Sequence, residues 1–256
     1  MNNKFKIANT NSSFLGLIGI VFFLIIWQFV GSNGIINPLF ISYPSQIATS
    51  LLYFFSSGFI YSHIFISMQE FLIGYIVAIL LGVLVGILIG WYKLIYGFTN
   101  IFIIVLYVTP VVAFIPLLML WLGITLWSKI VIVALFAFFP IVINTSTGIK
   151  ATNPEFVKVA RSFGANDFKL FTTVAIPSSF PYILSGMRLA AGRALIGVVV
   201  SELYGSQGGL GYLLTLFGST FQTDRLMASI FIITLIGVTV IGIIQLIEKR
   251  LVFNQE

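Results

Sequence analysis

The stretch IFISMQEFLIGYIVAILLGVLVGILI, residues 64–89, decides the fold because its only charged side chain is Glu70. A helix rises about 1.5 Å per residue, so this run is long enough to cross a hydrocarbon core of about 30 Å. Five further apolar runs cover residues 14–30, 96–120, 130–144, 186–203 and 226–247. None shows the two-residue alternation of a membrane barrel. The sequence therefore predicts an all-α integral membrane protein with about six transmembrane helices.

The composition agrees with this class, since 59% of the 256 residues are hydrophobic and only 8% are charged. We expect one transmembrane domain over residues 1–256, with its core at about 60–248. The first run could instead be the apolar core of a secretory signal. No clear Ala-x-Ala site follows it, and Trp27 lies where an interfacial anchor would, which favours a retained span.

The distribution of Lys and Arg predicts the orientation, because these residues favour the cytoplasmic side of a membrane. Arg188 and Arg193 lie inside the fifth run, and only Lys129 and Arg225 fall on one side. The other side carries nine basic residues: Lys4, Lys6, Lys93, Lys150, Lys158, Arg161, Lys169, Lys249 and Arg250. Both termini and the long segment after the fourth run are therefore expected in the cytoplasm, with the chain in the cell membrane.

Several functional classes lack their sequence signatures. Neither a Gly-x4-Gly-Lys phosphate-binding loop nor a Gly-x-Ser-x-Gly nucleophile motif occurs. His63 is the single histidine and cysteine is absent, so the usual zinc site cannot form. The net charge of +6 is spread over membrane-flanking segments, which favours lipid headgroups over nucleic acid as partners. We expect no catalytic residue, no metal site and no cofactor bound by this chain.

The segment at about 148–185 departs from the apolar character of its surroundings, and its first part predicts a short helix. Asn153 is a good N-cap, Pro154 suits the first helical position, and Glu155 complements the positive end of the helix dipole. Gly164 can end the helix in the left-handed conformation. Helical spacing places one face at Phe156, Val159 or Ala160, and Phe163.

A second short helix is predicted from Asn166 and Asp167 to Pro177, where proline should stop it. Its apolar face would consist of Phe168, Phe171 and Val174. Two amphipathic helices outside the membrane have apolar surface to bury. Periodicity leaves open whether they pack on the ends of their own bundle or on another protein.

This segment resembles the cytoplasmic coupling loop of binding-protein-dependent ABC transporter permeases. The family signature is Glu-Ala-Ala, three residues, Gly, nine residues and Ile-x-Leu-Pro, and here Gly164, Val174, Ile176 and Pro177 fill its second half. Val159 and Ala160 occupy the alanine positions, whereas Lys158 replaces the glutamate. Four more stretches resemble the nitrate, sulfonate and taurine branch: PVVAFIPLLMLWLGI from Pro110, FFPIVINTSTGI from Phe138, PYILSGMRLAAGRALIGVVVSEL from Pro181 and GGLGYLL from Gly208.

The resemblance implies a permease that forms the translocation pathway of an ATP-driven importer. Its implied partners are a second permease copy, two cytosolic ATPase subunits that bind ATP and Mg, and an extracytoplasmic substrate-binding protein. The implied substrate is a small anion such as nitrate, a sulfonate or taurine, with a thiamine-precursor pyrimidine or another heterocycle as the alternative. The implied ATPase-coupling residues are Glu155, Lys158, Val159, Ala160, Arg161, Gly164, Ala165, Val174 and Pro177.

Two further groups of residues are candidates for specific roles. Gly82, Gly86 and Gly90 repeat every four residues and so share one face of the second span, which favours close packing of another helix. Glu202 is predicted toward the external end of the fifth span, either at the interface or facing the pathway, and we favour the pathway. Glu70 has the same two interpretations.

Two alternatives to an ABC importer remain at this point. A self-sufficient secondary transporter or channel typically has inverted repeats and ionisable groups near the middle of the membrane. We find no convincing internal repeat, and the ionisable residues lie near the ends of the runs. A structural scaffold would fit the composition but gives no reason for the order of the motifs.

Overall fold

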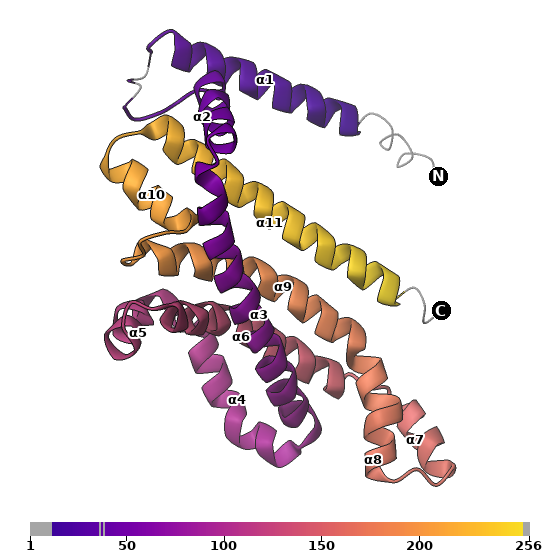
Figure 1. The fold of residues 1–256 in the computed structure, drawn as a ribbon. Helices are drawn as coiled ribbons and strands as arrows, with labels where there is room; N and C mark the ends of the chain where they lie inside the picture. The colour runs from indigo at the N-terminus through magenta and orange to yellow at the C-terminus, as the bar shows by residue number, and fades with distance from the viewer. Residues whose placement is uncertain (1–11, 36, 38, 253–256) are drawn as a thin grey trace, which may run out of the picture. The chain divides into compact units, whose positions relative to one another are not determined.

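The computed structural model describes residues 12–35, 37 and 39–252, and every regular element within them is helical. Lys4 and Lys6, which contribute to the predicted orientation, lie outside these residues. In chain order the elements are α1 (Ser12–Ser32), α2 (Pro44–Ser56), α3 (Phe59–Trp91), α4 (Lys93–Val108), the 3₁₀ turn η1 (Val111–Phe114), α5 (Ile115–Leu122), α6 (Leu126–Lys150), α7 (Pro154–Ser162), α8 (Asp167–Leu170), the π-helical turn η2 (Phe171–Ala175), α9 (Ile176–Leu203), α10 (Leu210–Ser219) and α11 (Thr223–Val252) (Figure 1).

The predicted all-α membrane class is confirmed. Five helices in the described part of the chain are long and apolar enough to cross a membrane, and a bent pair provides a sixth span if it is counted as one. Four of the five correspond to predicted runs that the structure extends at one or both ends. The fifth corresponds to the run at 186–203, but its helix starts much earlier, as described below.

The prediction of a continuous third span over residues 96–120 is wrong. α4 and the following η1–α5 segment are bent by 85°. Thr109 between them is extended, with φ −66° and ψ 129°, because the ring of Pro110 disfavours a helical conformation in the preceding residue. Pro116 then lies in the first turn of α5, where a missing N–H costs nothing. The span is therefore broken near its middle.

The chain divides into two compact units, and the first comprises residues 1–61 and 213–232. Two hydroxyl groups fix its loops and helices: Ser50 of α2 donates to Asp224 Oδ2 at 2.6 Å, and Thr223 donates to the carbonyl of Leu39 at 2.6 Å. Phe54 of α2 is fully buried and stacks on Phe217 of α10, with ring centroids 5.7 Å apart. An aromatic core therefore holds this unit together.

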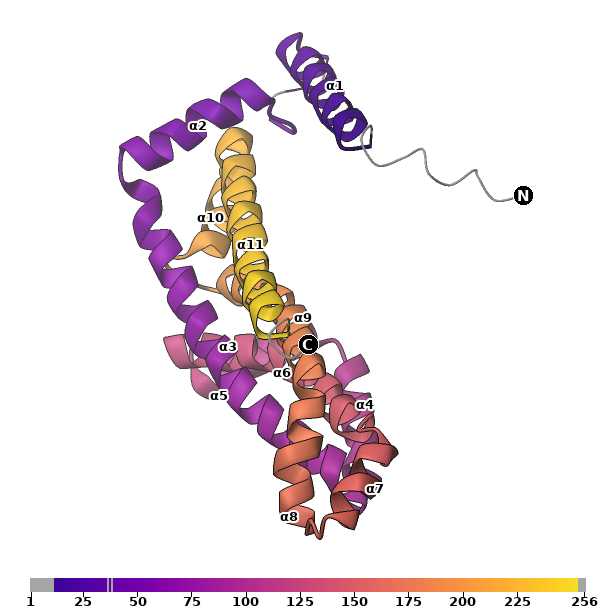
Figure 2. The ribbon, with the colours of Figure 1, turned by 90° about the vertical axis from the view of Figure 1, so that its right-hand side faces the viewer.

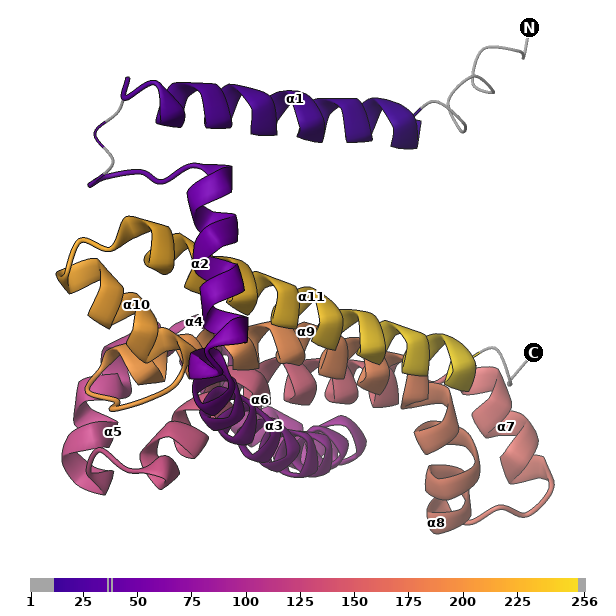
Figure 3. The same cartoon turned by 45° about the horizontal axis from the view of Figure 1, so that its top comes forward.

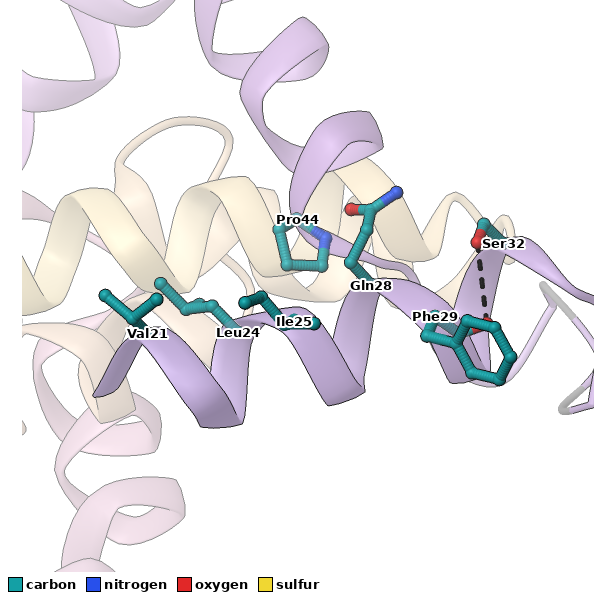
Figure 4. A pocket seen from close by; sticks show the side chains of 7 residues that line it. All are labelled: Val21, Leu24, Ile25, Gln28, Phe29, Ser32 and Pro44. Carbon is teal, nitrogen blue, oxygen red and sulfur yellow. Dashed lines mark hydrogen bonds between the residues drawn. The ribbon is translucent and has the colours of Figure 1, made fainter. Parts of the chain in front are cut away.

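Helix α1 of the same unit packs lightly and exposes most of its side chains, as a lipid-facing helix does. α2 runs across the direction of α1, which Figure 3 shows most clearly. Trp27 donates its indole N–H to the carbonyl of Ser42 at 2.8 Å, and Gln28 receives the backbone N–H of Ser45 at 3.0 Å. Beside these contacts the second half of α1 and Pro44 border a mainly apolar hollow of about 500 Å³ (Figure 4).

The second unit comprises residues 62–212 and 233–256, and its centre is a seam between α3 and α6. Gly82, Gly86 and Gly90 face this seam. A Cβ added at these positions would lie 2.9, 2.6 and 2.7 Å from the Cβ atoms of Ile141, Thr145 and Ile149, respectively, all in α6. The partner of the glycine stripe is thus a helix of the same chain, and it runs parallel to α3. Without a hydrophobic driving force in lipid, such close backbone approach supplies the van der Waals contact that holds helices together.

Helix α9 completes the core by running antiparallel to α6, and the two helices lie side by side along most of their length (Figure 3). Figure 2 shows α9 continuing into α8 at its lower end. Small residues again allow the approach: Ala190, Ala191 and Ala194 of α9 are fully buried against the aromatic and aliphatic side chains of α3 and α6. Tyr75 of α3 is held to α9 by donating its hydroxyl to the carbonyl of Met187 at 2.7 Å. Three helices therefore form one rigid core within this unit.

Candidate functional site

The predicted first helix of the 148–185 segment is confirmed as α7, and both its ends are fixed by local hydrogen bonds. Asn153 Oδ1 accepts the backbone N–H of Glu155 at 2.9 Å, and Pro154 is the first helical residue. At the other end Gly164 has φ +77°, and the N–H of Ala165 reaches the carbonyl of Ala160 at 3.0 Å. This bond over five residues is typical of a Schellman motif. α7 is therefore a short rigid helix rather than a flexible loop.

α7 leaves its apolar face uncovered. Phe156, Val159 and Phe163 are 59, 56 and 86% exposed, and Phe168 at the start of the second helix is 75% exposed. Ala160 on the same helix is half-buried, and Lys158 is exposed. The first helix therefore does not pack its aromatic residues on the ends of its own bundle. Of the two alternatives left by periodicity, packing on another protein remains for this helix. Such a group of exposed aromatic side chains is typical of a surface that binds a partner.

α8 begins as predicted, and a short link joins it to α7. Asn166 Oδ1 accepts the N–H of Lys169 at 2.8 Å, which makes Asn166 the N-cap. Arg161 and Asp167 form an ion pair of 2.7 Å across the turn between the two helices. Both side chains are mostly exposed, so the pair orders the turn without adding much stability. α7 and α8 lie together at one end of α9 (Figure 1).

The prediction that the second helix stops at Pro177 is wrong. The chain stays helical from Asp167 to Leu203, passing through the π turn of η2 into α9. A proline lacks an N–H and its ring crowds the carbonyl four residues earlier. The wider π turn just before Pro177 relieves this conflict, and Val174 lies within that turn half-buried. Phe171 rests on Trp91 of α3 with ring centroids 5.0 Å apart, so the second helix is anchored to the core.

A buried polar cluster lies at the other end of α9, where α3 and α6 begin. Lys129 of α6 places its ammonium 2.8 Å from Glu70 Oε1 and 2.7 Å from the hydroxyl of Ser206. The side chains of Lys129 and Glu70 are 10% and 1% exposed. Glu70 is thus buried inside the bundle and not exposed at an interface, and whether it faces the pathway stays a prediction.

Glu202 belongs to the same cluster and is 1% exposed. Its Oε1 accepts the hydroxyl of Ser67 at 2.7 Å, and its Oε2 accepts the backbone N–H of Gly211 at 2.6 Å. The interfacial interpretation of Glu202 therefore does not fit the structure, and its oxygens are occupied by protein donors. Whether Glu202 contacts a solute in transit stays a prediction.

The segment between α9 and α10 is tied to this cluster through its backbone. The N–H groups of Gly209 and Leu210 donate to His63 Nδ1 at 3.1 Å and to Ser67 Oγ at 2.8 Å. Gly209 has φ +106°, and any Cβ there would collide with the carboxylate of Glu202. Glycine at this position thus allows both the turn and the close approach.

A cavity of about 470 Å³ opens beside the Glu70–Lys129 pair. Its polar lining residues are Gln69, Glu70, Thr125, Lys129, Ser206 and Gln207. Amide, hydroxyl and charged groups together favour a small polar solute or water over an apolar ligand. Across the residues that the structure describes, no group of three or more His, Cys, Asp and Glu could hold a metal ion.

Lys129, Ser67 and Ser206 were not among the residues that sequence reasoning selected. Lys129 was assigned to a connecting segment as a loop charge, whereas the structure buries it with Glu70. No local sequence pattern predicts the ion pair between Lys129 and Glu70, since 59 residues separate them in the chain. The position of Lys129, within the first turns of a helix capped by Thr125, is the sequence feature that could have indicated a buried charge.

Comparison with known proteins agrees with these features. Residues 78–253 match the family described as "Binding-protein-dependent transport system inner membrane component". The chain belongs to this family. The family predicted from the coupling-loop motif is therefore confirmed. The chain is an ABC importer permease and not a secondary transporter, a channel or a structural scaffold. It is a multi-pass membrane protein.

Individual relatives agree with this family. A Bacillus subtilis permease named for aliphatic sulfonates transport is 32% identical to the chain, over 92% of this chain and 86% of the relative. The formylaminopyrimidine transport permease protein of Halalkalibacterium halodurans is 31% identical over 93% and 96%. A chain of the MetNI methionine ABC transporter, solved in inward-facing conformations, shares the fold with a TM-score of 0.56 and 18% identity, over 74% of this chain and 93% of that one.

Proposed function

We propose that this permease works as a homodimer and that α7 and α8 of each copy dock on one of two separate ATPase subunits. The observation that carries the proposal is the exposed aromatic face of α7 on a helix capped at both ends. A capped helix loses little conformational entropy on docking, so buried apolar area can contribute to binding. The proposed contact residues are Glu155, Lys158, Val159, Ala160, Arg161, Gly164, Ala165, Val174 and Pro177.

The docking segment and both termini are proposed to lie in the cytoplasm. In the second unit α3 and α6 end, and α9 begins, at the same end of the core, and the basic residues Lys93, Lys150 and Lys169 lie near these helix ends. Lys129 at the opposite end is buried in an ion pair. The exposed positive charge thus gathers at the α7–α8 end, in the pattern typical of the cytoplasmic side. Residues 1–256 would form a single permease domain in the cell membrane.

ATP and Mg are proposed to bind only to the ATPase subunits, since this chain has no phosphate-binding loop. An extracytoplasmic binding protein would deliver the substrate to the end of the core that holds Glu70 and Glu202. The continuous helix from Asp167 to Leu203 supports mechanical coupling, because a displacement of α8 that passes the π turn of η2 reaches the far end of α9.

A small anion such as nitrate, a sulfonate or taurine is the substrate class we propose. The relative named for aliphatic sulfonates transport supports it. The formylaminopyrimidine permease favours the alternative, a thiamine-precursor pyrimidine or another heterocycle. Uptake of a labelled alkanesulfonate and of a labelled aminopyrimidine by the reconstituted transporter would separate the two.

The decisive experiment is purification of the tagged permease from its own membranes in mild detergent, followed by an ATPase assay and crosslinking. The chain lacks cysteine, so Ala160→Cys introduces one thiol in α7. We expect it to crosslink to a co-purifying nucleotide-binding subunit. Gln207→Cys is the matched control, because it is exposed at the opposite end of α9 and should give no such product. A chain that transports its substrate with no ATPase partner would contradict the proposal.

Substitution of Gly164 tests the docking geometry. Gly164→Leu is expected to abolish transport, because a left-handed residue other than glycine costs about 1–2 kcal/mol and the side chain blocks close approach. Gly164→Asn tolerates the left-handed conformation better. Normal uptake by the leucine variant, present in the membrane at the usual level, would contradict the assignment.

A further inference from the structure

The buried cluster at the α3–α6–α9 end contains more negative than positive charge if every group is ionised. Glu70 and Glu202 supply two carboxylates, and Lys129 supplies one ammonium. Charges this deeply buried are strongly disfavoured unless they are compensated. One further positive charge is therefore needed in or beside the cluster.

One atom shows where that charge belongs. Glu70 Oε2 is buried and, within the described part of the chain, receives no hydrogen bond, whereas Glu70 Oε1 is paired with Lys129. Ser67 lies one turn before Glu70 in α3 and donates its hydroxyl to Glu202 Oε1 at 2.7 Å, so the carboxyl groups of Glu70 and Glu202 are neighbours in the cluster. Two neighbouring buried carboxyl groups disfavour each other's ionised form, so one of the pair tends to keep a proton.

We propose that Glu70 and Glu202 share one bound proton, so that this end of the permease is a proton-binding site. The proton gives Glu70 Oε2 the partner that it otherwise lacks and makes the cluster electrically neutral with Lys129. Glu202 keeps the donors it has from Ser67 and Gly211. This site is distinct from the docking segment and does not depend on which substrate is carried.

The described side chains around the pair supply one positive charge, that of Lys129. From α6 the facing charge is Lys129, whose ammonium already donates to Glu70 and Ser206. His63 lies about two turns before Glu70 in α3, and its Nδ1 accepts the N–H of Gly209. Tyr212 stacks on His63 with ring centroids 6.0 Å apart. The hydroxyl groups of Ser67 and Ser206 remain neutral.

Loss of the proton would loosen the segment between α9 and α10. That segment is held through Gly211 to Glu202, through Leu210 to Ser67 and through Ser206 to Lys129. Two facing carboxylates would push Glu202 away from α3 and weaken these bonds together. The proton therefore stabilises the closed arrangement of this end of the core.

Infrared spectroscopy of the full-length permease, labelled with ¹³C in its glutamate carboxyl groups, tests the site. We expect the band of a protonated carboxyl group at neutral pH and its loss as the pH rises. Glu70→Gln should remove that band, since its amide donates to Glu202 and leaves Lys129 balanced by one carboxylate. Glu248→Gln is the matched control: Glu248 of α11 pairs at 2.9 Å with Arg188 of α9, away from the cluster, so the band should persist.

A second readout measures the closed segment directly. Leu210 is buried and Gln207 is exposed, so the ratio of thiol labelling rates of Leu210→Cys and Gln207→Cys cancels the general effect of pH on thiols. We expect the ratio to rise with pH and to stay constant when Glu70→Gln is added. Absence of a protonated glutamate band in the unsubstituted chain at neutral pH would overturn the proposal even if no variant folds. A band that persists in both Glu70→Gln and Glu202→Gln would overturn it as well.

Discussion

Replacement of Gly86 by alanine tests whether the glycine stripe holds α3 against α6. The added Cβ would lie 2.6 Å from Thr145 Cβ and 2.9 Å from the carbonyl oxygen of Val142. Non-bonded carbon atoms settle at about 3.5–4.0 Å, so the helices would have to separate by roughly 1 Å at this point. Overpacking of this kind costs about 1–3 kcal/mol. This exceeds the gain of about 1 kcal/mol that alanine brings over glycine in a helix.

The assay is equilibrium unfolding of the purified chain in mixed micelles, followed by its helical signal. Gly97→Ala is the matched control, because a Cβ there has no atom within 4 Å and Gly97 also lies inside a helix. We expect Gly86→Ala to be less stable than the parent chain and Gly97→Ala to be equal or more stable. Thr145→Gly added to Gly86→Ala removes the opposing Cβ and should recover part of the loss.

A Gly86→Ala chain as stable as the Gly97→Ala chain would refute the reasoning. That result would mean that α3 and α6 are not in close contact. The hydrogen bond from Tyr75 of α3 to Met187 of α9 would then have to hold α3 in the core without the glycine stripe. Failure of Thr145→Gly to restore any stability would place the strain at the Val142 carbonyl instead.

Three further changes have expected sizes. Lys129→Met leaves Glu70 buried without its ion-pair partner and should cost about 3–5 kcal/mol in denaturant unfolding, most of which Glu70→Met in the same chain should recover. Asn153→Ala removes the N-cap of α7 and should cost that helix about 1 kcal/mol, visible as faster amide hydrogen exchange in α7 alone. Arg188→Gln breaks a partly exposed pair with Glu248 and should change the unfolding free energy by less than about 1 kcal/mol, which the same denaturant titration would measure.

The ends of α7 and the start of α8 could be predicted from the sequence because the responsible interactions are local. Asn153 and Asn166 each bind a backbone N–H within three residues of themselves. Gly164 adopts its positive φ to end α7. Where the chemistry that fixes a helix end lies within one turn, residue types and spacing are sufficient.

Proline positions show where this reasoning fails. The run over residues 96–120 is mostly apolar, so its average hydropathy does not indicate the helix break that Pro110 causes at Thr109. Pro177 has the opposite outcome, since the π turn before it absorbs the missing hydrogen bond and the helix continues. The effect of a proline therefore depends on whether neighbouring residues can widen the turn, which the sequence pattern does not reveal.

The buried cluster could not be predicted for a different reason. Glu70 and Glu202 were recognised as candidates, but their partners come from elsewhere in the chain: Lys129 lies 59 residues after Glu70, and Ser67 lies 135 residues before Glu202. The count of basic residues in connecting segments predicts Lys129 as a loop charge, whereas its side chain is 10% exposed. The packing of α3 on α6, together with that of α9 against both, brings these groups together.

The helix from Asp167 to Leu203 joins the two candidate sites of the second unit. Its 37 residues span about 55 Å, and its buried alanines fit against α6 along the core. A close-packed interface of this kind tolerates two discrete positions better than a gradual slide. A displacement of α8 by a docked ATPase would therefore either stay within the π turn or move α9 as a whole. In the second case Glu202 moves relative to Glu70 and Lys129, and the hydrogen bonds that close the far end of the core break together.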